Sequence, residues 1–252
     1  MACFLQDEGK LKISIMEGTE MTGMGPNTWI WVIFIGFAVL SWLVSKRLQN
    51  RFQKYSKIAT ANGMTGKEVA EKMVRDHGLE GIKIGSVDGQ LTDNYNPANK
   101  SINLSKEVYY GANVAAAAVA AHECGHAIQH AKAYGMLKLR SALVPMVSFA
   151  SKWMTWVLLA GILMVETFPS LLLAGICLFA TTTLFSLITL PVEIDASRRA
   201  LAWLDHSGFT TTDTQPYAKD ALKWAAYTYV IAALSSLATL LYYIMIFLGR
   251  RN

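Results

Sequence analysis

Cysteine is scarce in this chain. Only three cysteines, Cys3, Cys124 and Cys177, occur among the 252 residues, and no two of them form a CxxC pair. This distribution excludes a disulfide-stapled scaffold and favours a reducing compartment.

Charged residues are also few. They make up 16% of the chain, whereas hydrophobic residues make up 53%, and the mean hydropathy is positive. Long apolar runs predict transmembrane segments. The net charge of +5 comes with lysine and arginine residues near the ends of these runs, which is typical of membrane topology and not of nucleic-acid binding. We therefore expect a lipid bilayer as a partner and no nucleic acid.

A secretory signal peptide is a third missing feature. Residues 1–27 lack the basic start, apolar core and small-residue cleavage site of such a signal. We interpret them as an N-terminal extension.

The apolar runs divide the rest of the chain into membrane and soluble segments. We expect a first transmembrane helix (28–45), a cytoplasmic part (46–140), a transmembrane hairpin (141–191), a second cytoplasmic segment (192–223), and a fourth transmembrane helix with its tail (224–252). Five lysine and arginine residues between positions 46 and 57 place the following part in the cytoplasm. Because a hairpin returns the chain to its starting side, the two cytoplasmic segments must share one membrane face. Arg250 and Arg251 would then lie outside, against the positive-inside rule.

The first cytoplasmic part shows patterns of short helices and strands. Thr65 and Glu68 form a capping box at the start of a helix. The run Gly81–Gly85 alternates as a short strand, and turn residues around Asn94–Asn99 predict a β-hairpin. Asn113 can cap a long alanine-rich helix. An edge strand beside that helix can either hold an extended peptide by main-chain hydrogen bonds or merely cover the helix.

The alanine-rich helix carries an HExxH pattern. His122 and His126 are four residues apart, so on a helix both imidazoles lie on one face and can bind the same metal ion. Glu123 can orient a water molecule at that metal and take its proton. Two unrelated surface histidines would be the simpler explanation, but the surrounding small residues predict burial, and a buried His-Glu-His cluster without a metal would be poorly satisfied.

A catalytic zinc site usually takes a third protein ligand and keeps one position open. The candidates on the same membrane face are His77, His130, Glu193, Asp195, His206 and several outlying carboxylates. His130 lies about 12 Å along the helix from His122, too far to join both motif histidines on one ion. Glu193 follows the third apolar run at the membrane interface, where an unpaired carboxylate is costly. We favour Glu193 over Asp195, which would point about 200° away on a helix; Asp195 or Ser197 could instead orient a ligand imidazole.

Several separated motifs carry a resemblance to a known family. They are AAHECGHAIQHA, LTDNYNPANKSINLS, LKLRSALVP and LPVEIDASRRAL. Together they resemble the membrane-embedded neutral zinc metallopeptidases of the YugP type, over roughly residues 46–251, and more distantly the HtpX-like membrane proteases. The resemblance implies Zn2+ as cofactor, His122, His126 and Glu193 as metal ligands, and Glu123 as catalytic base. The HtpX-like relatives carry an aspartate one turn after the ligand glutamate, where this chain has Ser197.

The sequence therefore predicts a mainly α integral membrane protein. We expect about four transmembrane helices and a small cytoplasmic α+β zincin-like metallopeptidase part, in a multi-pass protein of the cell membrane with its active site facing the cytoplasm. The expected activity is zinc-dependent endopeptidase cleavage of membrane or membrane-proximal protein substrates. Candidate donors to the oxyanion are Tyr95, Tyr109, His130 and Arg198.

Two other functions remain open at this point. One is a non-catalytic membrane scaffold with a structural metal site, although such sites are normally closed and rich in cysteine. Cys124 projects near the opposite side of the helix from His122 and would not complete one. The other is a metal-handling membrane protein, for which only Lys152 and Glu166 offer charge within the apolar runs.

Overall fold

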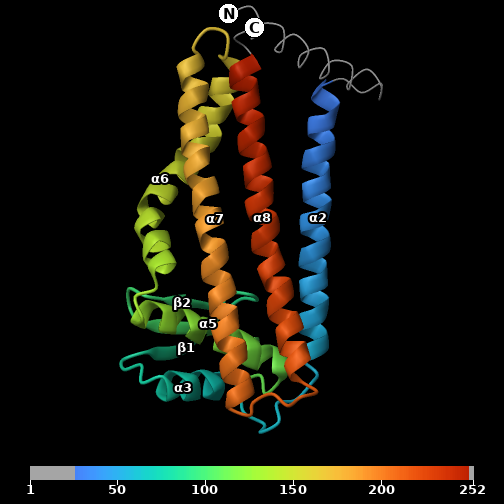
Figure 1. Cartoon of the computed structure of the whole chain (residues 1–252), viewed down its shortest axis with the longest axis vertical. Coiled ribbons are helices and arrows are strands. Elements are labelled where there is room, and N and C mark those ends of the chain that lie inside the picture. The colour runs from blue at the N-terminus through green and yellow to red at the C-terminus, as the bar shows by residue number, and fades with distance from the viewer. Residues whose placement is uncertain (1–25, 250–252) are drawn as a thin grey trace, which may run out of the picture. The chain divides into compact units, whose positions relative to one another are not determined.

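The computed structural model describes residues 26–249. The fold is mainly helical with one small sheet, as the sequence predicts (Figure 1). The elements are α2 (Pro26–Tyr55), α3 (Gly66–Asp76), β1 (Lys83–Val87), β2 (Asn94–Asn96), β3 (Ser101–Ser105), α4 (Lys106–Tyr109), α5 (Val114–Ala131), α6 (Gly135–Leu163), α7 (Pro169–His206) and α8 (Gln215–Gly249). Most of the predicted N-terminal extension lies outside the described residues, as do Arg250 and Arg251.

The chain divides into two compact units, Met1–Trp42 and Leu43–Asn252. The described part of the first unit is the beginning of α2. Most of its large apolar side chains, among them Trp31 and Trp42, are exposed. The second unit holds the sheet, the remaining helices and every residue of the site considered below.

Four described helices are long and apolar enough to cross a membrane. They are α2 from Trp31, α6, α7 and α8. Only 6–28% of the most apolar window of each helix is buried inside the protein, which is the pattern of helices whose solvent is lipid. The prediction of four membrane-spanning helices is confirmed at the level of length and composition.

The sheet has three strands in the order β1-β3-β2. β2 and β3 pair antiparallel, which confirms the predicted hairpin, and β1 pairs with β3 in parallel. β1 begins at Lys83 instead of Gly81, since Gly81 adopts a positive φ of 76° that ends the preceding turn. β3 is central and mostly buried. The sheet contacts α5 through β2 and β3.

The core of the second unit is built around α5. The capping box predicted at Thr65 and Glu68 starts α3, and the side chain of Asn113 accepts the backbone N–H of Ala116 at the start of α5. The small alanine side chains of α5 let α3, the sheet and α7 pack closely against it. α5 is thus an interior helix, buried on nearly all sides.

α6 and α7 form the predicted helical hairpin, and Figure 1 shows α7 running beside α8. At Gly161 a Cβ atom would lie 2.6 Å from the Cα of Leu172, so the two helices meet backbone to backbone. α7 is continuous through Pro191, with 38 residues and a length of about 57 Å. This is roughly twice the thickness of a bilayer core. The end of α7 that carries Glu193 can therefore reach beyond a membrane that its beginning spans.

Candidate metal centre

The crossing of α5 and α7 brings the two predicted metal-binding segments together. Gly125 lies at the contact: a Cβ atom there would be 2.6 Å from the carbonyl oxygen of Ala196. This close approach needs a residue without a side chain, and it explains the glycine inside the HECGH motif. It sets the side chains of His122 and His126 opposite Glu193.

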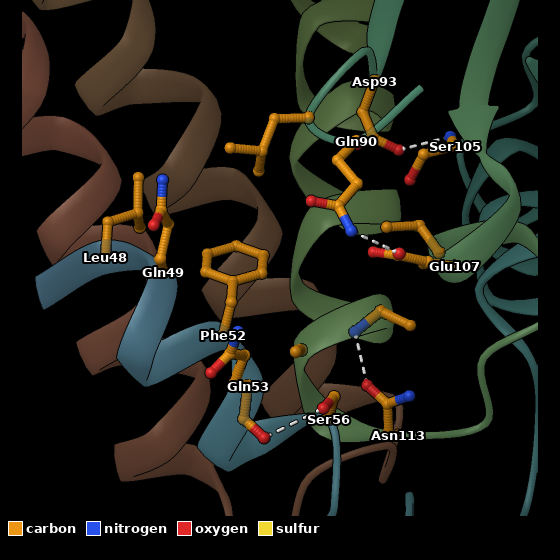
Figure 2. Close-up of a pocket in the computed structure, with 14 residues that line it drawn as sticks. Leu48, Gln49, Phe52, Gln53, Ser56, Gln90, Asp93, Ser105, Glu107 and Asn113 are labelled. Carbon is orange, nitrogen blue, oxygen red and sulfur yellow. Dashed lines mark hydrogen bonds between the residues drawn. The ribbon is translucent and has the colours of Figure 1, made fainter. Parts of the chain in front are cut away.

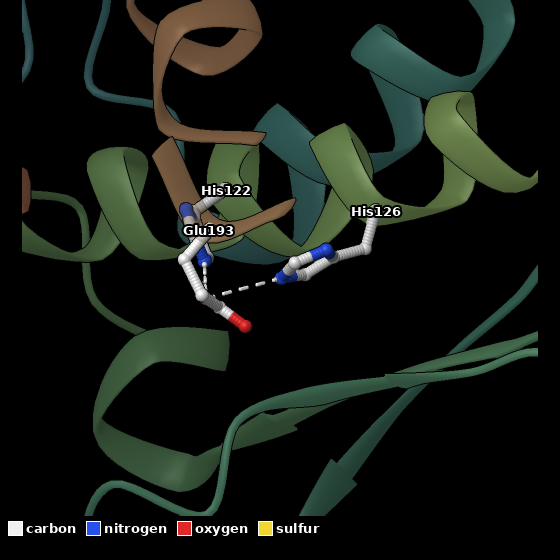
Figure 3. Close-up of side chains that lie close together, drawn as sticks. All are labelled: His122, His126 and Glu193. Carbon is white, nitrogen blue, oxygen red and sulfur yellow. Dashed lines mark hydrogen bonds and ion pairs between the residues drawn. The ribbon is translucent and has the colours of Figure 1, made fainter. Parts of the chain in front are cut away.

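Three side chains converge at this crossing, as Figure 3 shows. One carboxylate oxygen of Glu193, Oε2, lies 3.2 Å from Nε2 of His122 and 3.5 Å from Nε2 of His126. The three potential ligand atoms all lie within 4.8 Å of one another. Within residues 26–249 this is the one group of three or more such side chains that could hold a metal ion.

The far nitrogens of both imidazoles are occupied by other residues. Nδ1 of His122 lies 3.1 Å from Oγ of Ser197, and Nδ1 of His126 lies 3.0 Å from Oε1 of Gln129. When each Nδ1–H donates to its oxygen partner, each Nε2 keeps its lone pair for a metal. Ser197 is therefore the partner that holds the Nδ1 side of His122.

Gln129 connects α5 to α7 in the interior of the site. Its amide nitrogen donates to the carbonyl oxygen of Val192 at 2.8 Å and to Oδ2 of Asp195 at 3.0 Å. Because these two acceptors require the NH2 group, the amide oxygen must face His126, and Nδ1 of His126 must be the donor. The sequence did not single out Gln129, although its position three residues after a ligand histidine could have drawn attention.

Asp195 does not take part in the converging group. Its carboxylate is held by Arg198 and Arg199, each at 2.6 Å, as well as by Gln129. The geometry thus favours Glu193 over Asp195 as the third ligand. Cys124 is also outside the group: its Sγ lies 3.7 Å from the carbonyl oxygen of Ala70, and burial raises the pKa of this thiol. Cys124 is therefore a protonated core residue and not a metal ligand.

Glu123 is buried beside the two histidines, with 7% of its surface exposed. Burial raises the pKa of its carboxyl group above the ordinary value, while the two neighbouring histidines oppose this rise. A carboxylate that is costly to ionise is a better proton acceptor than an exposed one. Glu123 also lines a cavity of about 190 Å3 together with His122 and Glu193.

The same cavity contains a residue that the sequence analysis missed. Tyr229 of α8 lines it together with Glu193 and Glu123. The sequence offers no signal for it beyond an aromatic residue in an apolar helix. The four donors predicted from the sequence do not line the cavity; the hydroxyl of Tyr95 is 2.9 Å from Nδ1 of His130, and Arg198 pairs with Asp195.

Comparison with known proteins decides the family. A family profile described as "Putative neutral zinc metallopeptidase" matches residues 30–248. This chain belongs to that family. It is also 40% identical over 222 residues to a protein of Bacillus subtilis (strain 168) described as "Putative membrane protease YugP", and the match covers 87% of this chain and 98% of that relative. No solved structure matches the chain. The resemblance to the YugP-type family seen in the sequence is confirmed.

The converging side chains suit the metal that this family implies. Two imidazole nitrogens and one carboxylate oxygen are a donor set that zinc takes in hydrolytic enzymes. Tetrahedral zinc with bonds of about 2.0–2.1 Å separates neighbouring ligand atoms by about 3.3–3.4 Å. The separations of 3.2 and 3.5 Å between Glu193 and the histidines bracket this value. His122, His126 and Glu193 therefore fit a zinc ion.

Proposed function

We propose that the protein is a zinc-dependent membrane endopeptidase. The observation that carries this proposal is the convergence of His122, His126 and Glu193, with Glu123 facing the same cavity. Family membership supports the reaction class. Three protein ligands beside a cavity are typical of a catalytic zinc site, whereas structural sites are closed by a fourth ligand.

The residues around the cavity divide the chemistry between them. Zinc, when bound, lowers the pKa of water and polarises the scissile carbonyl group. Glu123 takes the proton from the attacking water and passes it to the leaving amine. Ser197 and Gln129 hold the two imidazoles in the tautomer that leaves each Nε2 free.

We assign to Tyr229 the role of donor to the developing oxyanion. Its hydroxyl group can donate one hydrogen bond, and Tyr229 lines the cavity together with Glu123 and Glu193. A fixed donor in a buried site stabilises the charge that appears on the carbonyl oxygen in the transition state. This assignment replaces the four candidates that the sequence suggested.

We further propose that the site faces the cytoplasm of a cell membrane crossed four times. Residues 46–140 and 192–223 would form a zincin-like part on that face. The basic residues that follow the first apolar run support this orientation. Substrates would then be cytoplasmic segments of membrane proteins or proteins close to the membrane.

The substitution Glu123→Gln tests the proposal. It preserves size and hydrogen bonding but removes the base, so we expect bound zinc to remain and peptide cleavage to fall by at least about a hundredfold. Zinc content by atomic absorption and cleavage of a quenched peptide pool by purified full-length protein provide the two measurements. Cleavage by the variant at the parent rate would refute the role of Glu123.

Chelation separates the enzyme from the non-catalytic scaffold. For the enzyme, a chelator abolishes cleavage and added zinc restores it. A proteomic comparison of membranes carrying the parent and Glu123→Gln would then identify substrates as proteins that accumulate only with the variant. If the two membrane proteomes are indistinguishable, the proposed endopeptidase has no membrane-protein substrate in that cell.

A further inference from the structure

A second cavity adjoins the metal centre, and Figure 2 shows it between α2 and the loops around the sheet. We call it the side pocket; its volume is about 150 Å3. Four residues line both cavities: Leu48, Phe52, Leu91 and Asp93. The side pocket therefore opens into the same space as Glu123 and Glu193. A peptide placed across the metal centre has room for one of its side chains there.

The side pocket carries negative charge without a compensating cation. Asp93 and Glu107 line it, whereas no lysine or arginine of the described chain lines either cavity. This is notable in a protein with 23 lysine and arginine residues against 18 acidic ones.

Both carboxylates have neutral hydrogen-bond partners. An oxygen of Asp93 accepts the backbone N–H of Ser105 at 2.7 Å, and Glu107 accepts from Nε2 of Gln90 at 2.8 Å. Burial raises the pKa of the Asp93 carboxyl group, and the charge of Glu107 adds to this rise. A cation between the two groups would relieve their mutual repulsion.

The walls of the side pocket are apolar and suit the aliphatic stem of a basic side chain. Leu48 and Phe52 of α2 and Leu91 of the loop before β2 present apolar surface. Lysine and arginine have long aliphatic stems that pack on such surface while the charged head reaches polar groups. Arg51 and Tyr55 fix this end of α2, because both contact the carboxylate of Asp220 on α8.

We propose that the side pocket is a specificity subsite that takes a lysine or arginine side chain close to the scissile bond of the substrate. This inference rests on the proposed peptidase function and names its substrate class: extended peptides with a basic residue. Electrostatic complementarity would admit such segments and repel acidic ones. Cytoplasmic flanks of transmembrane helices are rich in lysine and arginine, so they belong to this class.

A positional library of internally quenched octapeptides tests the subsite on the purified, zinc-loaded full-length protein. Each position near the cleaved bond carries lysine, norleucine or glutamate in turn. We expect lysine at one position to raise kcat/KM about tenfold over norleucine, as for a hydrogen-bonded charge pair. Glutamate at that position should reduce kcat/KM.

Three variants locate the preference in the side pocket. Asp93→Asn/Glu107→Gln should abolish the lysine preference while zinc content stays unchanged. Glu107→Gln alone should reduce the preference about threefold. This single variant keeps the hydrogen bond between Asp93 and Ser105, so it tests the subsite even if the double variant folds poorly. Glu80→Gln is the matched control, since it removes one negative charge away from both cavities.

A binding measurement separates failure of the subsite from failure of the peptidase. Fluorescence anisotropy of the lysine and glutamate peptides is recorded with Glu123→Gln, alone and combined with Glu107→Gln. The subsite is wrong and the peptidase stands if the parent cleaves peptides without a charge preference. The same holds if Asp93→Asn/Glu107→Gln keeps the lysine preference. If the parent cleaves nothing, the peptidase is wrong, and the binding data alone decide on the subsite. Binding of the lysine peptide about tenfold tighter than the glutamate peptide, and weakened by Glu107→Gln, supports the subsite. Equal binding of both peptides overturns it.

Discussion

Gln129 is the residue on which the proposed ligand geometry depends most. It is completely buried and joins His126 on α5 to Val192 and Asp195 on α7. Its amide sets which nitrogen of His126 carries the proton and thus which nitrogen faces Glu193. Residues that orient a ligand in this way contribute to metal affinity without touching the metal.

Replacing Gln129 by leucine should weaken zinc binding by about tenfold to a hundredfold. The loss follows because His126 becomes free to rotate or to place its proton on Nε2. Competition with a fluorescent zinc chelator measures the affinity. Gln215→Leu is the control: this amide also joins two segments, by donating to the carbonyl oxygen of Leu201, but it lies outside the site. Equal zinc affinity in both variants would contradict the orienting role.

Replacing Tyr229 by phenylalanine should lower kcat by about a hundredfold to a thousandfold and leave KM and zinc content nearly unchanged. The substitution removes one hydroxyl group, so the packing of α8 is preserved. Steady-state kinetics on a quenched peptide separates kcat from KM. Tyr227→Phe, on the same helix and outside the cavity, should behave as the parent. A rise in KM at constant kcat would instead make Tyr229 a residue that binds the ground state.

The residues found from the sequence are those whose geometry is local. The HExxH spacing fixed the relative positions of His122 and His126 through helix periodicity alone. Glu193 was found because an isolated carboxylate at a membrane interface needs a partner. Tyr229 could not be found in this way, since its place depends on how α8 packs on α5 and α7. Contacts between helices far apart in sequence carry no periodic signal.

At the scale of elements, the site depends on one helix crossing. The sequence predicted the α5 helix, its Asn113 cap and the α6–α7 hairpin, because caps and apolar runs are local patterns. Pro191 lies inside α7, and the helix is continuous through it. That continuity holds Glu193 on the same rigid helix as Ala196, which contacts Gly125.

Adding a methyl group at this crossing should disturb the metal centre without replacing any of its ligands. Gly125→Ala would place Cβ 2.6 Å from the carbonyl oxygen of Ala196, so α5 and α7 must move apart. We expect a loss of about 1–3 kcal/mol in the free energy of unfolding and weaker zinc binding. Thermal unfolding and zinc competition measure the two effects. Gly135→Ala is the control, because no atom lies within 4 Å of the added group; a Gly125→Ala variant as stable as this control would refute the close crossing.

At the scale of the whole molecule, the hairpin of α6 and α7 constrains the topology. α6 and α7 are both long enough to cross a bilayer, and only residues 164–168 separate them. If both cross it, the chain returns to its starting face, which places α5 and the end of α7 on one side. A metal site shared by His122 and Glu193 requires this arrangement.

Labelling of single cysteines with a membrane-impermeant maleimide tests the topology. The background is Cys3→Ser/Cys177→Ser, in which Cys124 remains but is buried. Three exposed positions receive cysteine: Lys100 between β2 and β3, Asp213 between α7 and α8, and Thr167 between α6 and α7. On intact cells we expect labelling at position 167 only, and labelling at positions 100 and 213 after permeabilisation.

The labelling pattern distinguishes an error in the hairpin from an error in the orientation of the site. If positions 100 and 213 become labelled from opposite sides, the hairpin does not cross the membrane twice, and His122 and Glu193 could not share a metal. If both are labelled on intact cells and position 167 is not, the hairpin stands but the site faces outward. The basic residues after the first apolar run would then lie on the outer face, against the positive-inside rule. The motif helix and Glu193 must lie on the same membrane face in either orientation. The proposed zinc site therefore requires that positions 100 and 213 are labelled from the same side, whichever side that is.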